Sequence, residues 1–313
     1  MGKPARAHRR VDVRELARNQ DGVVSRRQLL ALGVTRWQIQ AELRAARWRA
    51  HGRQTVAVHT GNLADRAPYW FATFEAGPRS AIDGHSALVL AGLKNSTPTH
   101  TRVSTPRGAP AVRRPGLHVR QTRRLEPDDV IAAGVRRVRP AIAAVRAGLW
   151  AASDRQAATL LAMTVQQRLA TAEDVGLALL HVRRDKRRRF LEAIVLDLLS
   201  GAQSLGELDF AELCRRHGLP EPDRQSVRNR PDGRTYLDVW WDRYGVVVEV
   251  DGIQHQWVQA SIPDALRQNR VSIDGETVLR VPVLGLRVAS AEFMAQIAEA
   301  LCAGGWTSTR AAS

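Results

Sequence analysis

The chain has 313 residues, of which 44% are hydrophobic. Single domains usually span about 100 to 200 residues, so this length predicts two or three domains. The chain has no run of about 18 or more apolar residues, and it begins with the polar sequence MGKPARAHRR. We therefore expect neither a membrane span nor a secretory signal, and a cytoplasmic location.

Positive charge is the strongest feature of the composition, with a formal net charge of +16 at pH 7. Residues 1–60 carry 13 Arg/Lys and 4 Asp/Glu (13 − 4 = +9), and residues 61–204 carry 22 and 12 (22 − 12 = +10). Residues 205–300 are acidic, with 11 and 15 (11 − 15 = −4). The basic part predicts a polyanionic partner, above all nucleic acid.

The N-terminal segment has the signals of short helices. Val11–Asn19 has a helical pattern, and Ser25–Gln28 and Thr35–Gln38 each have the spacing of a capping box, in which both side chains satisfy free N–H groups at a helix start. Trp48–His59 then alternates around a glycine turn, which is typical of a hairpin. Three short helices and a hairpin predict a winged helix-turn-helix domain over residues 11–60.

In such a domain the third helix enters the major groove of DNA. Arg36, Gln40 and Arg44 are spaced by four residues and share one helix face. Arginine can bond guanine edges and glutamine can bond adenine, so these are candidate base contacts. Arg53, at the hairpin tip, would reach phosphate. The alternative is that these positions are solvated and that the domain contacts protein.

Residues 11 to about 60 resemble the N-terminal winged-helix domain of AbiEi-type antitoxins. The resemblance is carried by LARNQDGVVSRRQLLALGVTRWQIQAEL and by Gly52–Gln54 in the wing. Residues 61 to about 150 are similar to the following part of such proteins, through the GHSA motif that contains His85 and through a strand-like Thr99–Ser104. We interpret His85 as a helix cap or a satisfied, partly buried histidine rather than a catalytic group.

The middle region, residues 61–203, is expected to change from α/β to helical. Its amphipathic segments are Arg139–Trp150, Asp154–Ala162 and Ala172–Leu180. A basic run over residues 183–189 precedes an apolar helix. It is either a nucleic-acid contact or the solvated face of that helix, which is the commoner role of a charge run.

From Ser204 the pattern changes to α-β-β-β-α-β, the order of the core of restriction-type nucleases. We expect a nuclease-like domain over residues 204–303, with disordered tails at residues 1–10 and 304–313. The expected elements are Leu205–His217, Arg224–Asn229, Thr235–Trp241, Val246–Asp251, Pro263–Asp274 and Glu276–Val281.

The strand Val246–Asp251 carries the chemistry of this domain. Side chains alternate along a strand, so its valines face an interior while Glu249 and Asp251 project together from the other face. Asp238 lies on the neighbouring strand. Three converging carboxylates repel unless a cation neutralises them, which predicts a hard divalent ion, Mg²⁺ or Mn²⁺. The ion would polarise a phosphate and supply a hydroxide-like nucleophile.

This part of the chain resembles the PD-(D/E)XK nuclease superfamily and, within it, the very-short-patch-repair (Vsr)-like endonucleases. The motifs are LPEP before Gln225, YLDV around Asp238, VVEVDG before His255, and LR ending at Arg280, with Asp264 and Arg267 between them. The resemblance implies that Asp238 and Glu249 bind the metal, that the carbonyl of Val250 is a further ligand, and that Glu207 is an additional helix-borne acid.

One position departs from the family pattern. Asp251 stands where the last motif residue is often lysine. His255 could then act as general acid or base, and Arg267, Arg280 and Gln225 are candidates to contact the substrate, the arginines by offsetting phosphate charge. The alternative is that Asp251 ends the strand and His255 is a surface histidine.

The sequence thus predicts a multidomain α+β protein in which a basic winged helix places a metal-dependent endodeoxyribonuclease on DNA. The alternative function is a DNA-binding transcriptional regulator or antitoxin-like protein whose nuclease fold is inactive. Homodimerisation, and binding to a cognate toxin or to a repair or defence protein, are compatible with both.

Overall fold

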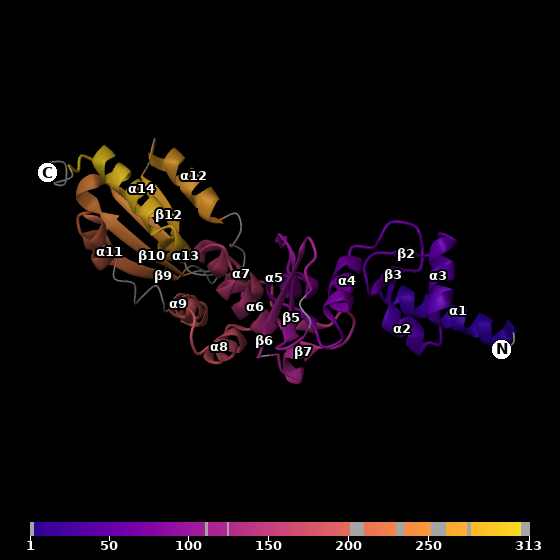
Figure 1. Cartoon of the computed structure of the whole chain (residues 1–313). Coiled ribbons are helices and arrows are strands. Elements are labelled where there is room, and N and C mark those ends of the chain that lie inside the picture. Colours follow the sequence, from indigo (N-terminus) through magenta and orange to yellow (C-terminus); the bar gives the residue numbers. More distant parts are fainter. Residues whose placement is uncertain are drawn as a thin grey trace. The chain divides into compact units, whose positions relative to one another are not determined.

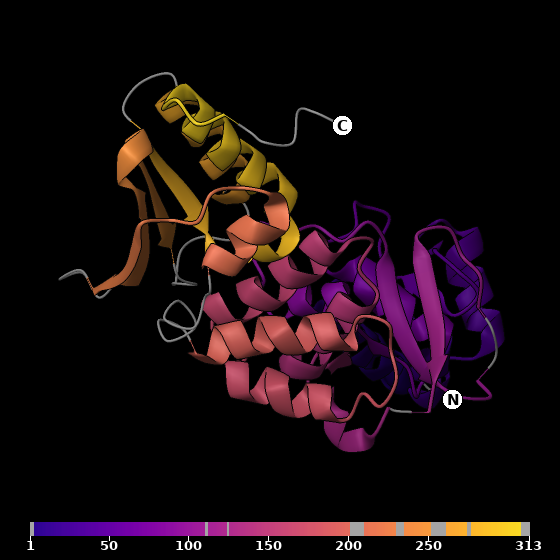
Figure 2. The same ribbon diagram turned by 90° about the vertical axis from the view of Figure 1, so that its left-hand side faces the viewer.

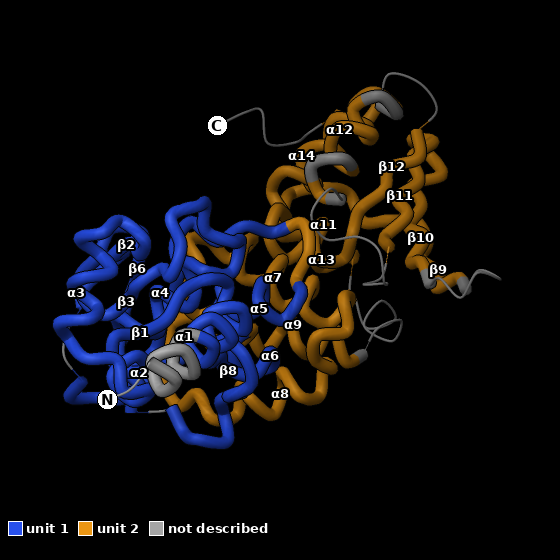
Figure 3. The backbone as a smooth tube through the Cα atoms, turned by 90° about the vertical axis from the view of Figure 1, so that its right-hand side faces the viewer, with its two compact units in different colours: residues 1–92, 96–143 blue, residues 93–95, 144–313 orange. Residues whose placement is uncertain are grey.

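A computed structural model of the chain describes residues 3–109, 112–123, 125–200, 210–229, 235–251, 261–273 and 277–307. The chain divides into two compact units, one of residues 1–92 and 96–143 and the other of residues 93–95 and 144–313 (Figure 3). Helices and three sheets make up the described residues, so the chain is a mixed α/β protein. No helix in that described part is both long and apolar enough to cross a membrane.

The first unit begins with a small sheet among short helices (Figure 1). The elements are α1 (Lys3–Arg18), β1 (Val23–Ser25), α2 (Arg26–Ala31), α3 (Arg36–Arg44), β2 (Arg49–Ala50) and β3 (Thr55–Ala57), and the strand order is β1-β3-β2. Both expected capping boxes are present, at Ser25–Gln28 and at Thr35–Gln38. They begin α2 and α3 where the sequence predicts.

Two features of this segment differ from expectation. Strand β1 pairs with β3 and was missed, although two adjacent β-branched residues, Val23 and Val24, favour a strand there. Helix α1 begins at Lys3, within the segment expected to be a disordered tail. The helix can extend this far because residues 3–10 include alanines and arginines, which are good helix formers, and no glycine.

The remainder of the first unit is built around a five-stranded sheet of order β6-β5-β4-β8-β7. Of the elements of this part, the sequence predicted the helix that begins at Gly84 and the strand near Thr99. The elements are α4 (Ala67–Ala76), β4 (Ala81–Ile82), α5 (Gly84–Leu90), β5 (Thr101–Pro106), β6 (Leu117–Thr122), β7 (Val130–Ile131) and β8 (Arg137–Val138). Helix α6 (Pro140–Leu149) spans the point where the chain passes from one unit to the other.

The second unit contains a helical part followed by an α/β part. The helices are α7 (Asp154–Gln166), α8 (Ala172–Leu180) and α9 (Arg188–Ser200). The α/β part has α11 (Phe210–His217), β9 (Arg224–Asn229), β10 (Thr235–Trp241), β11 (Val246–Asp251), α12 (Ser261–Ile273), β12 (Val278–Pro282), α13 (Val283–Val288) and α14 (Ser290–Ala303). The expected α-β-β-β-α-β order is present among these elements.

The expected middle region, residues 61–203, is divided between the two units. Its α/β portion belongs to the first unit and its helical portion to the second. A physical reason is visible on the helical side, where α7 contacts α13 and Asp197 of α9 forms a bidentate ion pair with Arg287 of α13. These contacts attach the helices to the α/β part that follows them.

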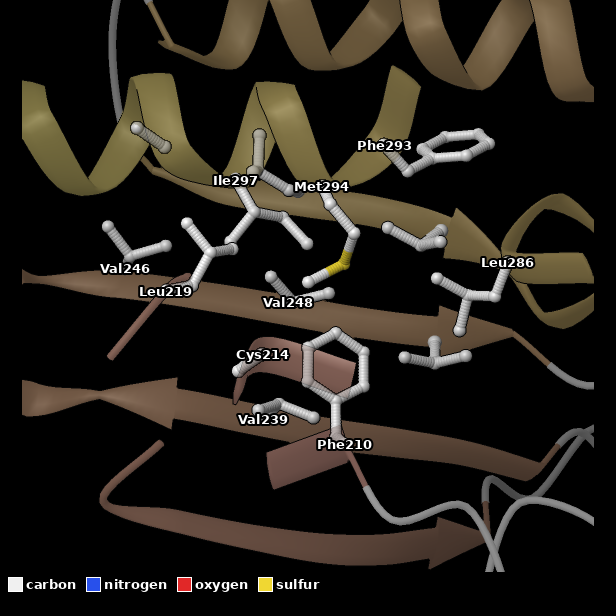
Figure 4. Close-up of a cluster of buried hydrophobic side chains, with 14 of the residues drawn as sticks. Phe210, Cys214, Leu219, Val239, Val246, Val248, Leu286, Phe293, Met294 and Ile297 are labelled. Carbon is white, nitrogen blue, oxygen red and sulfur yellow. The ribbon is translucent and has the colours of Figure 1, made fainter. Parts of the chain in front are cut away.

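The sheet of the second unit has strand order β12-β11-β10-β9, with β12 parallel to β11 and the other neighbours antiparallel. Helices α11 and α14 cover one face (Figure 2). Between them and the strands lies a core that includes Phe210, Val248, Phe293 and Ile297 (Figure 4). Trp306 packs against this core, so the packed chain continues past residue 303, the expected end of the domain.

Candidate functional site

The face of this sheet opposite the core carries a row of polar side chains, one from each strand. Ser226 of β9 is paired with Asp238 of β10, Asp238 with Glu249 of β11, and Glu249 with Arg280 of β12. Directly paired residues point to the same side of a sheet. The expectation that Asp238, on the neighbouring strand, lies on the same side as Glu249 is therefore confirmed, as is the burial of the alternate valines of β11 on the other face.

Asp238 is the most buried member of this row, with 1% of its surface exposed. Neither of its carboxylate oxygens accepts a hydrogen bond from the described residues. The guanidinium of Arg228 contacts Oδ2 as an ion pair without meeting hydrogen-bond geometry, and 58% of the Arg228 side chain is exposed. A buried carboxylate without donors is costly, so Asp238 is a polar group whose retention needs an explanation.

Glu249 lies beside a second arginine. Its side chain is 12% exposed, and its Oε2 lies 3.4 Å from Nε of Arg280. Arg280 is held from its backbone, because Asn269 of α12 accepts from its N–H and donates to its carbonyl at 2.8 and 3.0 Å. The two central carboxylates of the row are thus each paired with an arginine.

Asp251 does not complete a cluster with these two residues. It is paired with Tyr236, two residues further along the strand from the Asp238–Glu249 pair. Among the residues that the structure describes, no three His, Cys, Asp or Glu side chains lie close enough together to hold a metal ion. The expectation that three carboxylates converge is therefore wrong for Asp251, although it shares their face.

The other sequence-predicted residues of this site are placed unequally. Gln225 is paired with Val239, a core residue, so it lies on the opposite face from Asp238. Arg267 is an exposed residue of α12. Val250 has its side chain in the core, and its carbonyl as a ligand stays a prediction. Glu207 and His255 lie outside the described residues.

The donor set at the centre of the row fits a hard divalent ion. Asp238 and Glu249 provide carboxylate oxygens on neighbouring strands, and the Asp238 oxygens lack hydrogen-bond donors among the described residues. Oxygen ligands of this kind are those that Mg²⁺ and Mn²⁺ prefer. Two side chains provide these oxygens, and a metal ion would compete with Arg228 and Arg280 for them.

In the first unit, Arg36, Gln40 and Arg44 are all exposed on α3, on one face of the helix. Trp37, which was not singled out from the sequence, lies on the same helix with 81% of its surface exposed. Tryptophan is highly buried on average, so one with this much exposed surface is unusual. The tryptophan lies next to Arg36 at the second position of the helix, and this placement was the available signal.

Arg53 is exposed, and its backbone is fixed from the neighbouring helix. Glu75 of α4 accepts hydrogen bonds from the backbone N–H groups of Arg53, Gln54 and Thr55 at 3.1, 2.7 and 3.0 Å. It also accepts from the Thr55 hydroxyl at 3.0 Å. Gly52 is required at this approach, because a Cβ there would lie 2.4 Å from Glu75 Oε1. This anchor was not predicted, since it joins residues far apart in the sequence.

The remaining candidates behave as structural groups. His85 Nε2 forms a 2.6 Å hydrogen bond with the Ser96 hydroxyl, and burial lowers its pKa, with Arg102 as a second cause. In the basic run, Arg187 binds Asp154 at 2.8 Å and Arg188 binds Glu192 at 2.8 Å. These pairs use part of the charge that a nucleic-acid contact would need.

Comparison with known proteins adds no family to these observations. No family model matches the chain, and no curated protein matches it.

Proposed function

We propose that the chain is a metal-dependent DNA endonuclease that a winged-helix domain at its N-terminus places on DNA. The observation that carries this proposal is Asp238, a buried carboxylate without hydrogen-bond donors among the described residues that is paired directly with Glu249. Under-satisfied buried acids concentrate at functional sites. The α-β-β-β-α-β order of the surrounding elements is the one that PD-(D/E)XK nucleases use, and it supports the same proposal.

In this function Asp238 and Glu249 would hold Mg²⁺ or Mn²⁺. When bound, the ion supplies polarisation of the scissile phosphate and an activated water. Arg228 and Arg280 neutralise the two carboxylates before the ion arrives, and their guanidinium groups would then be available for phosphate oxygens. Arg280 was expected in such a role, and Arg228 adds to it.

The DNA contact is proposed for α3 and the hairpin of β2 and β3. The order α1-β1-α2-α3-β2-β3 is that of a winged helix, and the exposed Arg36, Gln40 and Arg44 lie on the helix that such domains place in the major groove. The basic excess of residues 1–204 favours backbone affinity in the same part of the chain.

The decisive experiment is cleavage of supercoiled plasmid by the full chain with Mg²⁺ or Mn²⁺. Asp238→Asn should abolish metal-dependent cutting while DNA binding and its salt dependence remain. Glu221→Gln is the matched control, because this exposed acid in the same unit makes only a surface ion pair with Arg215. Metal-independent cutting, or no cutting with intact binding, would refute the nuclease.

A second experiment tests the winged helix separately. The double variant Arg36→Ala with Arg44→Ala should weaken duplex binding, because two contacts are lost. The binding constant should also depend less steeply on salt concentration. Arg107→Ala, at an exposed turn of the same unit, is the control for loss of charge alone. Unchanged binding by the double variant would refute the assignment of α3.

The second candidate function is a DNA-binding regulator or antitoxin-like protein in which the nuclease fold is inactive. The ion pairs of Arg228 with Asp238 and of Arg280 with Glu249 favour it, because arginine then supplies the charge that a metal would supply. Specific duplex binding without cleavage under any metal condition would select this function.

A further inference from the structure

A large cleft in the first unit is lined by apolar and polar residues together with five arginines. Its volume is about 1060 Å³. Its arginines come from α2, from the hairpin of β2 and β3, from the segment before β6 and from the position just before β8; they are Arg27, Arg53, Arg113, Arg114 and Arg136. The volume lies at the upper end of the range for ligand pockets, so the cleft has room for an extended ligand.

The single acidic side chain in the lining does not neutralise these arginines. The Glu75 side chain is 2% exposed and already accepts the four hydrogen bonds described above, and Nη2 of Arg114 lies 3.6 Å from its Oε2. Among the described residues, the guanidinium groups of Arg27, Arg53 and Arg113 have no ion-pair partner. The cleft therefore keeps a surplus of positive charge that favours an anion.

Aromatic rings of α4 form part of the same lining. Trp70 and Phe74 lie 5.6 Å apart between ring centroids, and Phe74 is partly exposed. Trp70 is fixed in place because its Nε1 donates to Asp21 at 3.0 Å. The Glu75 hydrogen bonds fix the backbone of Arg53 against the same helix, so this arginine and the rings are held in place before a ligand binds.

We propose that this cleft binds a single-stranded nucleic acid, with its phosphates on the arginines and a base on Phe74. Basic grooves combined with aromatic rings are the means by which proteins hold single strands. The bases of a duplex are stacked inside the helix and do not reach such a ring. The inference rests on the proposed function only in that the chain acts on nucleic acid. The cleft is a contact separate from α3, and Arg53 of the hairpin belongs to both proposed contacts.

The test uses the full chain and a fluorescein-labelled oligo(dT) of about 12 nucleotides, with a duplex of equal length. Arg27→Glu with Arg113→Glu should weaken single-strand binding and lower its salt slope by about 1.4, or about 0.7 for each lost phosphate contact. Duplex binding should change far less. Arg107→Glu is the matched control, since it reverses a charge in the same unit outside the cleft.

Phe74 provides a second, uncharged test. Phe74→Ala should weaken oligo(dT) binding by roughly 5- to 150-fold, the range for loss of one stacked base, and Phe74→Trp should restore it. Amide exchange in α4 checks that each variant remains folded. Equal binding of the single strand by the wild type, the double arginine variant and Phe74→Ala would overturn the proposal.

The outcomes separate this inference from the proposed function. Loss of duplex binding in the α3 variant with intact oligo(dT) binding supports two surfaces. If the protein never cuts DNA but the cleft variants bind oligo(dT) more weakly, the single-strand proposal stands and the nuclease proposal fails. Protection of the cleft by a free nucleotide, with no effect of the variants on oligo(dT), overturns the single-strand ligand.

Discussion

The two units each bury a carboxylate, and the two carboxylates have opposite surroundings. Glu75 in the first unit accepts three backbone N–H groups and one hydroxyl. Asp238 in the second unit accepts no hydrogen bond from the described residues and relies on an exposed arginine. In the first arrangement the hydrogen bonds offset the cost of desolvating the carboxylate. In the second this cost is not offset by hydrogen bonds, and a cation would stabilise the charge.

Two further buried carboxylates resemble Glu75 rather than Asp238. Asp83 accepts from the backbone N–H of Gly84 at 2.6 Å and from the Ser104 hydroxyl. Asp197 receives two hydrogen bonds of 2.8 Å from Arg287. Acids that accept hydrogen bonds hold elements together. Of these four acids, Asp238 is the one whose burial is least explained by a structural role.

The largest effect is expected at Glu75. Glu75→Ala leaves the backbone N–H groups of Arg53, Gln54 and Thr55 without their acceptor, which should cost about 3–5 kcal/mol of local stability. Amide exchange of residues 53–57 in the full chain measures this loss. Glu15→Ala, at an exposed position of α1, should leave that exchange unchanged. Equal amide protection of residues 53–57 in both variants would show that Glu75 does not stabilise this segment.

A smaller loss is expected when Asp197 is left without its partner. Arg287→Leu should destabilise the contact between α9 and α13 by about 1–3 kcal/mol, because 46% of the Arg287 side chain is exposed and water screens the pair. The hydrogen bonds that Arg287 donates to Asp197 raise the pKa of Arg287, which keeps the arginine charged. Amide exchange of α13 measures the loss. Adding Asp197→Leu should recover part of it, and additive losses would contradict coupling.

Asp238 should respond with the opposite sign. Asp238→Asn removes a buried charge without hydrogen-bond donors among the described residues, so stability should stay equal or rise by about 1 kcal/mol. Amide exchange of β10 and β11 measures this change. Loss of more than about 1 kcal/mol would place Asp238 with Glu75 as a structural residue and end the contrast between them.

The α-β-β-β-α-β order in the second unit could be predicted because its signals are local, whereas α13 and α14, which follow it, were not predicted. The alternation of valine and acid in β11 determines which face is buried, and the short turn before it fixes Asp238 opposite Glu249. The partners of these acids could not be predicted. Arg280 reaches Glu249 only because β12 returns parallel to β11 across a long connection, and Arg228 acts from a strand whose register was not known.

The first unit shows the same division between local and distant signals. The capping boxes predicted α2 and α3, since each depends on residues three apart. Strands β4 and β8 contain two residues each and pair across more than 50 residues, so neither has a periodic pattern to detect. Glu75 was missed for a similar reason, because its acceptor role depends on the distant wing backbone.

The smallest expected effect concerns His85, which is partly buried. It extends the comparison of buried acids to a buried base, whose charged form is the protonated one. Burial lowers its pKa, and Arg102 adds to this, so the folded protein binds a proton at His85 less readily than the unfolded chain does. The stabilisation is thus present above the unfolded pKa, near 6.5, and is lost as the pH falls through the lower folded value. Lowering the pH from about 7.5 to about 5 should decrease the protection factors of the α5 amides, which correct the exchange rates for the intrinsic effect of pH. His85→Gln should reduce that pH dependence while leaving the Glu75 contacts intact. An unchanged pH profile in His85→Gln would show that His85 does not couple burial to protonation.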